Sequence, residues 1–345
     1  MKRFKKASDV RVGVIGYGGA FNMGKAHLNE MQKAGMTPVA VAEIDKDRLK
    51  VAEDDFPGIQ TFSSVATMLK KADVNLVTII TPHNTHAKLA LQCLKAGCSV
   101  VCEKPLAITT EECDSMIREA KKRKLVLSTY HNRHWDSAIM EAVKRVRKGE
   151  IGEIVRIEGE MGGYQKPGDW WRSSKKISGG IMYDWGVHIL EYSLQVMDDE
   201  ILEVSGCHHT GFWNSKSAWK DDTNEDEGFL MVRFKKGGWL TLNISSINSN
   251  PKKGMLQFFG TKGSIMMVNP SAYEVHKKNS NGEQVVTSGR SGPAEGWRYY
   301  QNVSDHMVKG TELVISPEWS RRPIHILDLA GKSAKAKKAI KAKYK

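Results

Sequence analysis

A carboxylate and an imidazole lie one helical turn apart near the middle of the chain. Asp184 precedes His188 by four residues in the segment 180–197, whose pattern predicts a helix, so both side chains are expected on one face of it. Imidazole has an unperturbed pKa of about 6.5 and needs little adjustment to act as a general base. The carboxylate can orient that imidazole or hold a hydroxyl group. The pair could carry out proton transfer with His188 as the base, although a D-x-x-x-H pair is more often an ordinary contact along a helix face.

A glycine-rich turn follows the first predicted strand, 10–15. Its sequence is Ile15-Gly16-Tyr17-Gly18-Gly19-Ala20-Phe21. Gly16 can make a tight turn, and Gly18 has no side chain to keep the backbone away from a pyrophosphate. The N-terminus of the helix that follows supplies N–H donors for an anion. Phe21 replaces the third glycine of the G-x-G-x-x-G pattern, and Gly24 lies a few residues further on. The turn predicts a dinucleotide site, with a purely structural turn as the alternative.

The second predicted strand, 38–43, ends in an acid that bears on the choice of dinucleotide. The carboxylate of Glu43 can accept hydrogen bonds from both ribose hydroxyls of an adenosine and would repel a 2′-phosphate. Ile44, the next residue, offers no positive charge to hold that phosphate. The two residues therefore favour NAD over NADP.

The segments that must position these residues change character along the chain. Strands are predicted at 10–15, 38–43, 75–80, 99–102 and 125–130, with helices between them and another at about 136–148. Short β-branched runs separated by helices are typical of a doubly wound parallel sheet. Further along, alternating patterns at 153–163, 228–235, 238–247, 254–260 and 263–268 predict an open, largely antiparallel sheet. The polar stretch 278–293 predicts a loop. The expected fold class is α/β, with an α+β second domain.

Charge and composition limit the classes of partner. The chain has 345 residues and a net charge of +13, but seven lysines lie in the last fourteen residues and four positive charges in the first six. The remainder is nearly neutral, so the basic tail is interpreted as a solvated helix end or a frayed terminus, with a site for phosphate polymers or anionic lipid as the alternative, and no nucleic-acid partner is expected. No apolar run approaches the roughly 18 residues that span a bilayer. With no export signal recognised, no membrane partner, reduced cysteines and a cytoplasmic location are expected.

A set of motifs in a consistent order carries a family resemblance. They are Thr81-Pro82 with His86 beyond it, Glu103-Lys104-Pro105-Leu106-Ala107, Asn132-Arg133, Gly149-Glu150-Ile151-Gly152, and Trp171-Arg172 followed by Gly179-Gly180, Asp184, Gly186 and His188. Over about residues 10–200 the chain resembles the Gfo/Idh/MocA family, which includes glucose–fructose oxidoreductase and inositol dehydrogenase. It departs from the family pattern at Phe21, at Glu43, where many members have aspartate, and at Glu191, where a second acid, usually aspartate, follows the histidine.

The resemblance implies a Rossmann domain, a nicotinamide cofactor and a catalytic group. The implied cofactor-binding residues are Gly16, Tyr17, Gly18, Phe21, Glu43, Thr81, Pro82, His86, Glu103 and Lys104. The implied catalytic group is Lys104, Asp184 and His188, in which Lys104 donates to the reacting oxygen or to the carboxamide region. The family resemblance further implies oxidation or reduction at one carbinol of a sugar, cyclitol or sugar derivative. Because members often pair through the open sheet, a dimer or tetramer is expected.

The run Trp170-Trp171-Arg172 is unusual in a loop. Aromatic faces stack on the C–H faces of sugars, and arginine grips hydroxyl, carboxylate or phosphate groups. Core packing is the alternative for Trp170. Trp171 and Arg172 match the family pattern and, with Tyr164 and Arg133, are the predicted substrate residues. The histidine pairs elsewhere lack further ligands at a recognisable spacing, so no metal site is expected.

These patterns predict an NAD-dependent dehydrogenase acting on a secondary alcohol of a sugar or polyol. NAD-retaining glycosidases or lyases, which oxidise a ring carbon transiently, need the same apparatus and are the alternative; net NADH production against release of an aglycone separates the two. The predicted domains are 1–132 for the NAD-binding domain, 133–331 for the substrate and oligomerisation domain, and 332–345 for the basic tail.

Overall fold

A computed structural model describes residues 3–344 of the chain. Its packing forms two compact units. The first contains residues up to His131 together with a returning segment, Trp297–Arg321, and the second contains Asn132–Gly296 together with the chain from Arg322 onward. The division predicted above, at 1–132, 133–331 and 332–345, does not include this return, and as a set of domain boundaries it stays a prediction.

A parallel sheet forms the centre of the first unit. Its six strands have the order β3-β2-β1-β4-β5-β6. They are β1 (Arg11–Ile15), β2 (Thr37–Ala42), β3 (Gln60–Phe62), β4 (Leu76–Ile79), β5 (Ser99–Cys102) and β6 (Leu127–Thr129). The residues of β4, β5 and β6 are all buried, as expected where helices cover both faces of a parallel sheet. The predicted doubly wound sheet is confirmed, with one short strand, β3, that the sequence patterns did not include.

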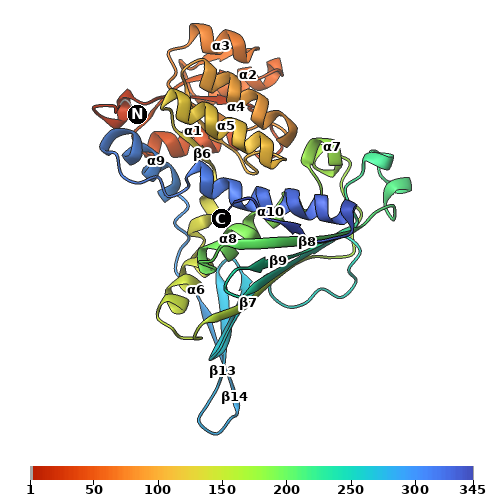
Figure 1. The fold of residues 1–345 in the computed structure, drawn as a ribbon. Helices are drawn as coiled ribbons and strands as arrows, with labels where there is room; N and C mark the ends of the chain where they lie inside the picture. The colour runs from red at the N-terminus through yellow and green to blue at the C-terminus, as the bar shows by residue number, and fades with distance from the viewer. Residues whose placement is uncertain (1–2, 345) are drawn as a thin grey trace. The chain divides into compact units, whose positions relative to one another are not determined.

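Helices follow each of the first five strands of this sheet, and one further helix comes from the returning segment. They are α1 (Met23–Lys33), α2 (Lys46–Asp55), α3 (Val65–Lys71), α4 (His86–Lys95), α5 (Thr110–Arg123) and α9 (Arg298–Lys309). The start of α5 is a capping box, in which Thr109 and Glu112 each accept the other's backbone N–H. Helix α9 lies beside α1 (Figure 1) and buries Tyr299 and Tyr300. The first unit is therefore completed by residues far along the chain.

A mixed, mostly antiparallel sheet forms the second unit. Its nine strands have the order β14-β13-β12-β11-β7-β10-β9-β8-β15, and β7 and β10 are the parallel neighbours. The strands are β7 (Ile154–Gly162), β8 (Ile201–His209), β9 (Glu227–Phe234), β10 (Trp239–Ser245), β11 (Leu256–Gly260), β12 (Gly263–Asn269), β13 (Ala272–Lys278), β14 (Gln284–Arg290) and β15 (Ile340–Lys341). The predicted open, largely antiparallel sheet is confirmed.

Helices pack on one face of this second sheet. They include α6 (Ser137–Arg147), the short α7 (Lys175–Ser178), α8 (Trp185–Val196) and α10 (Pro317–Ala336), which crosses the boundary between the units. Helix α8 packs against β7 and β10, so closely that a Cβ on Gly159 would lie 2.7 Å from Ile189 Cγ2. Alternate residues of β7, such as Glu158 and Glu160, therefore point to the opposite face.

Two segments differ from the sequence-based expectations. The stretch 278–293 is not a loop, because β14 pairs along its length with β13 and forms a hairpin that projects from the sheet (Figure 1). This edge strand is exposed on both faces, so it shows no apolar alternation that a sequence pattern could reveal. In the described part of the basic tail a helix end is present, as one of the two interpretations held, and the chain beyond it forms a short strand instead of a frayed terminus. Helix α10 continues to Ala336, and Ile340 pairs with Val204 of β8.

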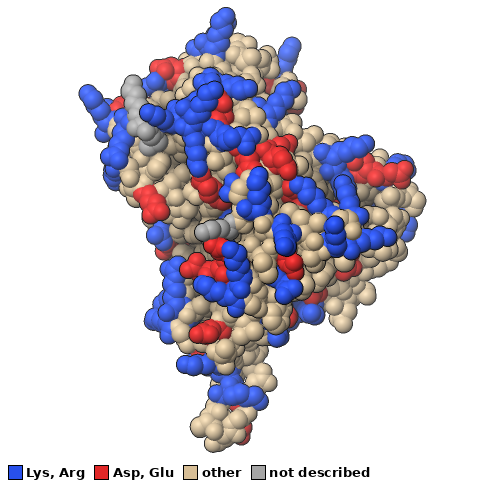
Figure 2. Space-filling view, in the orientation of Figure 1, with Lys and Arg blue, Asp and Glu red and all other residues tan. Residues whose placement is uncertain are grey.

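On one face of the molecule, basic side chains are spread out rather than gathered in one patch (Figure 2). On the face shown in Figure 2, lysine and arginine alternate with aspartate and glutamate. In the part of the chain that the structure describes, no helix combines the length and apolar character needed to cross a bilayer.

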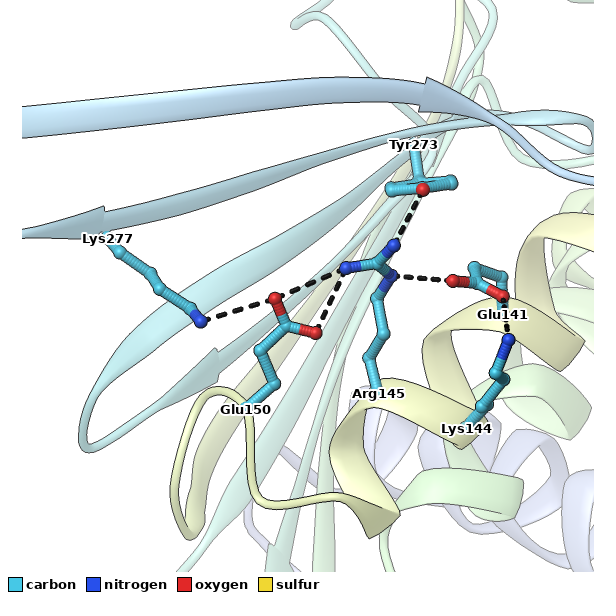
Figure 3. Close-up of polar contacts among 6 residues, drawn as sticks. All are labelled: Glu141, Lys144, Arg145, Glu150, Tyr273 and Lys277. Carbon is cyan, nitrogen blue, oxygen red and sulfur yellow. Dashed lines mark hydrogen bonds and ion pairs between the residues drawn. The ribbon is translucent and has the colours of Figure 1, made fainter.

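A charged network fastens α6 to the second sheet (Figure 3). Glu150 accepts from Arg145 Nη1 at 3.0 Å and from Lys277 Nζ of β13 at 3.2 Å. Arg145 also donates to Glu141 at 2.7 Å and to the Tyr273 hydroxyl at 2.7 Å. Partial burial opposes ionisation of Glu150, but the hydrogen bond from Lys277 and the charge of Arg145 outweigh it and lower the pKa of this carboxyl group.

Replacing this carboxylate is expected to destabilise the second unit. The change Glu150→Gln should lower the free energy of unfolding by about 1–2 kcal/mol at neutral pH, because charge-assisted hydrogen bonds are lost. A lowered folded-state pKa gives stability above the ordinary carboxyl pKa that is lost as pH falls through the folded value, so the difference from wild type should shrink in acid. Urea unfolding at several pH values measures both. The control Lys144→Gln, which removes an exposed ion pair with Glu141, should change stability by less than about 0.5 kcal/mol; an equal loss in both variants would contradict the assignment.

Candidate functional site

The glycine turn after β1 is shaped by close backbone packing. Gly16 has φ of +100°, and its N–H donates to Ala42 O at 2.9 Å. A Cβ on Gly16 would lie 2.5 Å from the carbonyl oxygen of Ile80, so no other residue fits. A Cβ on Gly18 would meet nothing within 4 Å. The turn is therefore tight on its inner side and open beside Gly18, as a pyrophosphate-binding turn requires.

Tyr17 and Gly24 together take over the packing role of the missing third glycine. Tyr17 is almost fully buried, and its hydroxyl donates to Asp55 Oδ2 at 2.9 Å. A Cβ on Gly24, in the first turn of α1, would lie 2.5 Å from the Tyr17 ring. Phe21 is 56% exposed, and α1 begins only at Met23. Any contact from Tyr17 to a cofactor would come from its backbone, because its side chain is directed into the domain.

Glu43 is held in place by backbone N–H groups. Its Oε2 accepts from Tyr17 N at 2.6 Å, and its Oε1 accepts from Ile44 N at 2.7 Å and from Asp45 N at 3.1 Å. A carboxylate has about four lone-pair sites, so these three bonds leave capacity for a hydroxyl donor. The acid is fixed at the end of β2, as the sequence predicted.

Arg48 is a cation at the glycine turn that the sequence patterns did not single out. Its Nε donates to Tyr17 O at 2.8 Å and its Nη2 to Asn22 Oδ1 at 3.3 Å. A Cβ on Gly19 would lie 3.3 Å from its Nη1. An arginine in the first turn of the helix after β2 is a sequence signal that could have identified this residue.

His86 ties two strand ends together from a fully buried position. Its Nδ1 lies 2.7 Å from Pro105 O and its Nε2 lies 2.8 Å from Thr81 O. Burial lowers the pKa of His86, although the hydrogen bonds to the two backbone carbonyl groups act in the opposite direction. The Thr81 hydroxyl bonds that of Thr85, which donates to Pro82 O at 2.7 Å. His86 can influence a bound cofactor only through the backbone of these turns.

Glu103 and Lys104 follow β5 at the same edge of the sheet. Glu103 Oε2 accepts the Lys104 N–H at 2.9 Å, and Glu103 Oε1 lies 3.0 Å from His27 Nε2. The Lys104–Pro105 peptide bond is cis. Burial opposes ionisation of Glu103, but the hydrogen bond from His27 and the charge of Lys104 outweigh it and lower its pKa. The backbone that carries Lys104 is thus bonded to an ionised side chain.

In the second unit, the predicted acid and the predicted arginine meet. Asp184 immediately precedes α8, and its Oδ1 accepts from Arg172 Nη1 at 3.0 Å. The Arg172 guanidinium lies 5.1 Å from the centre of the Trp170 ring and 5.3 Å from that of Trp171, a cation–π arrangement. The Trp-Trp-Arg run therefore forms one group with the start of α8.

His188 lies one turn into α8, with only 6% of its surface exposed. The Trp185 ring packs edge-on against it at 5.5 Å, and the Arg133 guanidinium lies 4.8 Å from the centre of the Trp185 ring. Arg133 Nη1 donates to Asp136 Oδ2 at 3.0 Å. Nothing in the sequence indicated Trp185. We call Arg133, Arg172, Asp184, Trp185 and His188 the α8 cluster.

The remaining predicted residues have other surroundings. Tyr164 is 57% exposed and packs against Phe212 and Trp213, at 6.0 and 5.8 Å between ring centres. Glu191, the second acid of α8, is buried, and its Oε1 lies 2.5 Å from His134 Nδ1. Among residues 3–344, no group of three or more histidine, cysteine, aspartate or glutamate side chains is arranged to hold a metal ion.

Comparison with known proteins decides the family. Residues 10–131 match the model of an oxidoreductase family with an NAD-binding Rossmann fold, and residues 139–266 match the C-terminal domain of the same family. The chain belongs to the Gfo/Idh/MocA family. It is thus an NAD(P)-binding oxidoreductase of the family that includes the inositol and levoglucosan dehydrogenases.

Relatives within the Gfo/Idh/MocA family extend over most of the chain. A scyllo-inositol 2-dehydrogenase (NADP(+)), IolW, of Bacillus subtilis is 23% identical over 99% of this chain and 98% of its own length. A myo-inositol 2-dehydrogenase of Thermotoga maritima is 26% identical over 75% of each chain. The structure of a levoglucosan dehydrogenase with NADH and levoglucosan has a TM-score of 0.83 at 21% identity, covering 97% of this chain and 99% of that one.

Substitutions at Gly18 and Gly24 should show which of the two glycines is needed for cofactor binding and which for packing. Gly24→Ala should lower the free energy of unfolding by about 1–3 kcal/mol, because the new methyl group overlaps the Tyr17 ring. Gly18→Ala should leave stability nearly unchanged but weaken NADH binding by at least about tenfold, because a side chain blocks the approach of phosphate. Thermal unfolding and NADH fluorescence titration measure the two effects. Unchanged NADH affinity in Gly18→Ala would mean that the open side of the turn is not the phosphate site.

Proposed function

We propose that this protein is an NAD-dependent dehydrogenase that oxidises one secondary alcohol of a neutral sugar or cyclitol, or reduces the corresponding ketone. The observation that carries the proposal is the α8 cluster, where an imidazole, paired charges and indole rings lie together in a chain whose other unit has a dinucleotide-binding turn. Inositol dehydrogenases among the relatives support the class of substrate.

The residues present fit a dinucleotide. The open side of the turn at Gly18 would receive the pyrophosphate, and Glu43, fixed by backbone N–H groups, has acceptor capacity for ribose hydroxyls. Lys104 follows β5 at the carboxyl edge of the parallel strands, where ligands of open α/β sheets bind. When bound, the nicotinamide supplies the carbon that accepts the hydride.

Each member of the catalytic group has one task. The imidazole of His188 accepts the proton of the substrate hydroxyl as the carbinol becomes a ketone. Asp184, held by Arg172, accepts a hydrogen bond from a neighbouring hydroxyl. The ammonium group of Lys104 donates to the reacting oxygen, where negative charge develops.

Paired charges favour a neutral substrate. Arg172 is bonded to Asp184 and Arg133 to Asp136, so each guanidinium of the α8 cluster already has a carboxylate partner. A phosphate or carboxylate group on the substrate would gain little from them and would approach two acids. Hydroxyl groups, in contrast, can donate to carboxylates and accept from guanidinium groups, and indole faces can stack on sugar C–H groups.

Two charged side chains bear on the choice between NAD and NADP. Glu43 stands at the end of β2, where the adenosine ribose is expected, and would repel a 2′-phosphate. Arg48 is held against Tyr17 O and borders Gly19, so its charge acts on the turn that receives the pyrophosphate, which both cofactors contain. This arrangement supports NAD as the preferred cofactor.

Self-association through the open sheet face stays a prediction. That face contains a hollow of about 450 Å³ lined by residues such as Glu158, Glu160, Thr241 and Asn243. It lies opposite the face that α8 covers, which leaves it available to a second copy of the chain.

Removing the proposed base should abolish most turnover. His188→Asn is expected to lower kcat by ~10²–10⁴-fold while NADH still binds, because only the proton acceptor is lost. Lys104→Ala should be at least as damaging. A panel of inositols and neutral sugars, followed by NADH absorbance, measures this, and His209→Asn, at an exposed histidine of the same unit, is the control. Unchanged turnover in His188→Asn would refute the base assignment. Release of an aglycone without net NADH would instead indicate a glycosidase or lyase.

Exchanging the acid after β2 should change cofactor preference. The double change Glu43→Ser, Ile44→Arg should raise kcat/KM with NADP relative to NAD, because repulsion is removed and a cation is added. Ile44→Arg alone, which keeps the carboxylate, is the matched control and should shift the ratio less. If the ratio does not move in the double variant, the adenosine ribose does not bind beside Glu43.

A further inference from the structure

Three buried polar side chains lead to the partly exposed carboxylate of Glu103, and all four residues lie within the first unit. The Thr78 hydroxyl of β4 lies 3.1 Å from the Tyr300 hydroxyl of α9. The Tyr300 hydroxyl lies 2.7 Å from His27 Nδ1 of α1, and His27 Nε2 lies 3.0 Å from Glu103 Oε1. We call Thr78, Tyr300, His27 and Glu103 the buried relay.

The direction of hydrogen-bond donation is defined at Glu103, the end of the relay next to Lys104. Thr78, Tyr300 and His27 are all fully buried, so water cannot substitute for a lost partner. An ionised carboxylate only accepts hydrogen bonds, so His27 Nε2 must donate to Glu103 whether the ring is neutral or protonated. The other oxygen of the same carboxylate accepts the Lys104 N–H at 2.9 Å. The orientation of the Lys104 peptide is thus linked, through one carboxylate, to α1 and α9.

We propose that His27 and Tyr300 are positioning residues that fix the Glu103 carboxylate and, through it, the backbone from which Lys104 reaches the reacting oxygen. This assignment rests on the proposed role of Lys104 in catalysis. Neither residue needs to contact substrate or cofactor, because the effect passes through Glu103. A small shift of a catalytic group can cost a large part of the rate, so a buried relay of this kind should influence turnover.

The adjacent tyrosine provides a matched comparison. Tyr299 is also buried, and its hydroxyl donates to Ser128 Oγ at 2.8 Å. Ser128 donates onward to Ile315 O at 2.7 Å, away from Glu103. The rings of Tyr299 and Tyr300 pack edge-on at 5.1 Å in the same helix. Loss of the Tyr299 hydroxyl removes one buried hydrogen bond, and loss of the Tyr300 hydroxyl removes two from the same core, but only the second loss breaks the relay.

Four variants test the relay by kinetics. Tyr300→Phe should lower kcat by about tenfold, with the KM for NAD and the Kd for NADH changed by less than about twofold. Tyr299→Phe should keep kcat within about twofold, although it too should lower the unfolding temperature, because it removes a buried hydrogen bond. His27→Leu should lower kcat by about 10–100-fold. His27→Gln, whose amide can donate to Glu103, should recover most of that loss. Equal kcat in the two tyrosine variants, or equal loss in the two His27 variants, would overturn the proposal.

A second measurement keeps this inference separate from the proposed function. The rate at which an acylating reagent modifies Lys104, followed by peptide mass mapping in the absence of substrate, reports on its surroundings without turnover. The rate should rise in Tyr300→Phe and His27→Leu and stay at the wild-type value in Tyr299→Phe. If the wild-type enzyme oxidised no polyol but these rates followed the expected pattern, the function would be wrong and the relay right. Identical rates in all the variants would refute the relay whether or not turnover is found.

Discussion

The ionised carboxylate of Glu103 is the constraint around which the first unit is organised. A charge that is mostly removed from water is costly unless it is paired and hydrogen-bonded, and here His27 and the Lys104 N–H supply the donors. His27 must then satisfy its second nitrogen, which it does with Tyr300. One acid after β5 thereby determines what α1 and α9 must place beside it, and the returning segment becomes part of the cofactor-binding unit.

This constraint explains why the division of the chain is hard to infer from local patterns. The sheet strands could be predicted because β-branched runs such as that of β4 show burial directly. Tyr300, in contrast, looks like any core aromatic until its hydroxyl is seen between His27 and Thr78. A hydrogen bond across 273 residues of sequence has no local signature. The polar hairpin of β13 and β14 was missed for a related reason, since an edge strand exposed on both faces needs no alternation.

The candidate site shows the same difference between features that local sequence patterns reveal and contacts that they do not. Residue types and spacing were sufficient to single out Gly16, Gly18, Glu43, Asp184 and His188, because turns and helix faces follow local rules. Which residues pair with them was not predictable in this way, although Arg172 and Arg133 were themselves singled out as substrate residues. Arg172 bonds Asp184 from twelve residues away, Arg133 lies over Trp185, and Arg48 borders the glycine turn from the next helix. Sequence spacing thus identifies groups that can do chemistry, and tertiary packing supplies the groups that set their charge and orientation.

Charge pairing links the two halves of the proposed reaction. Around Tyr17, Glu43 accepts the backbone N–H while Arg48 donates to the carbonyl oxygen, so one residue of the turn is held by opposite charges. In the α8 cluster, Arg172 and Arg133 are each held by an aspartate. Two unit charges 4 Å apart interact by about 4 kcal/mol at an effective dielectric constant near 20, so an anion added to the α8 cluster meets attraction and repulsion of similar size. Recognition then depends on hydrogen-bond geometry, which suits a polyol and the hydroxyls of a ribose better than an additional phosphate.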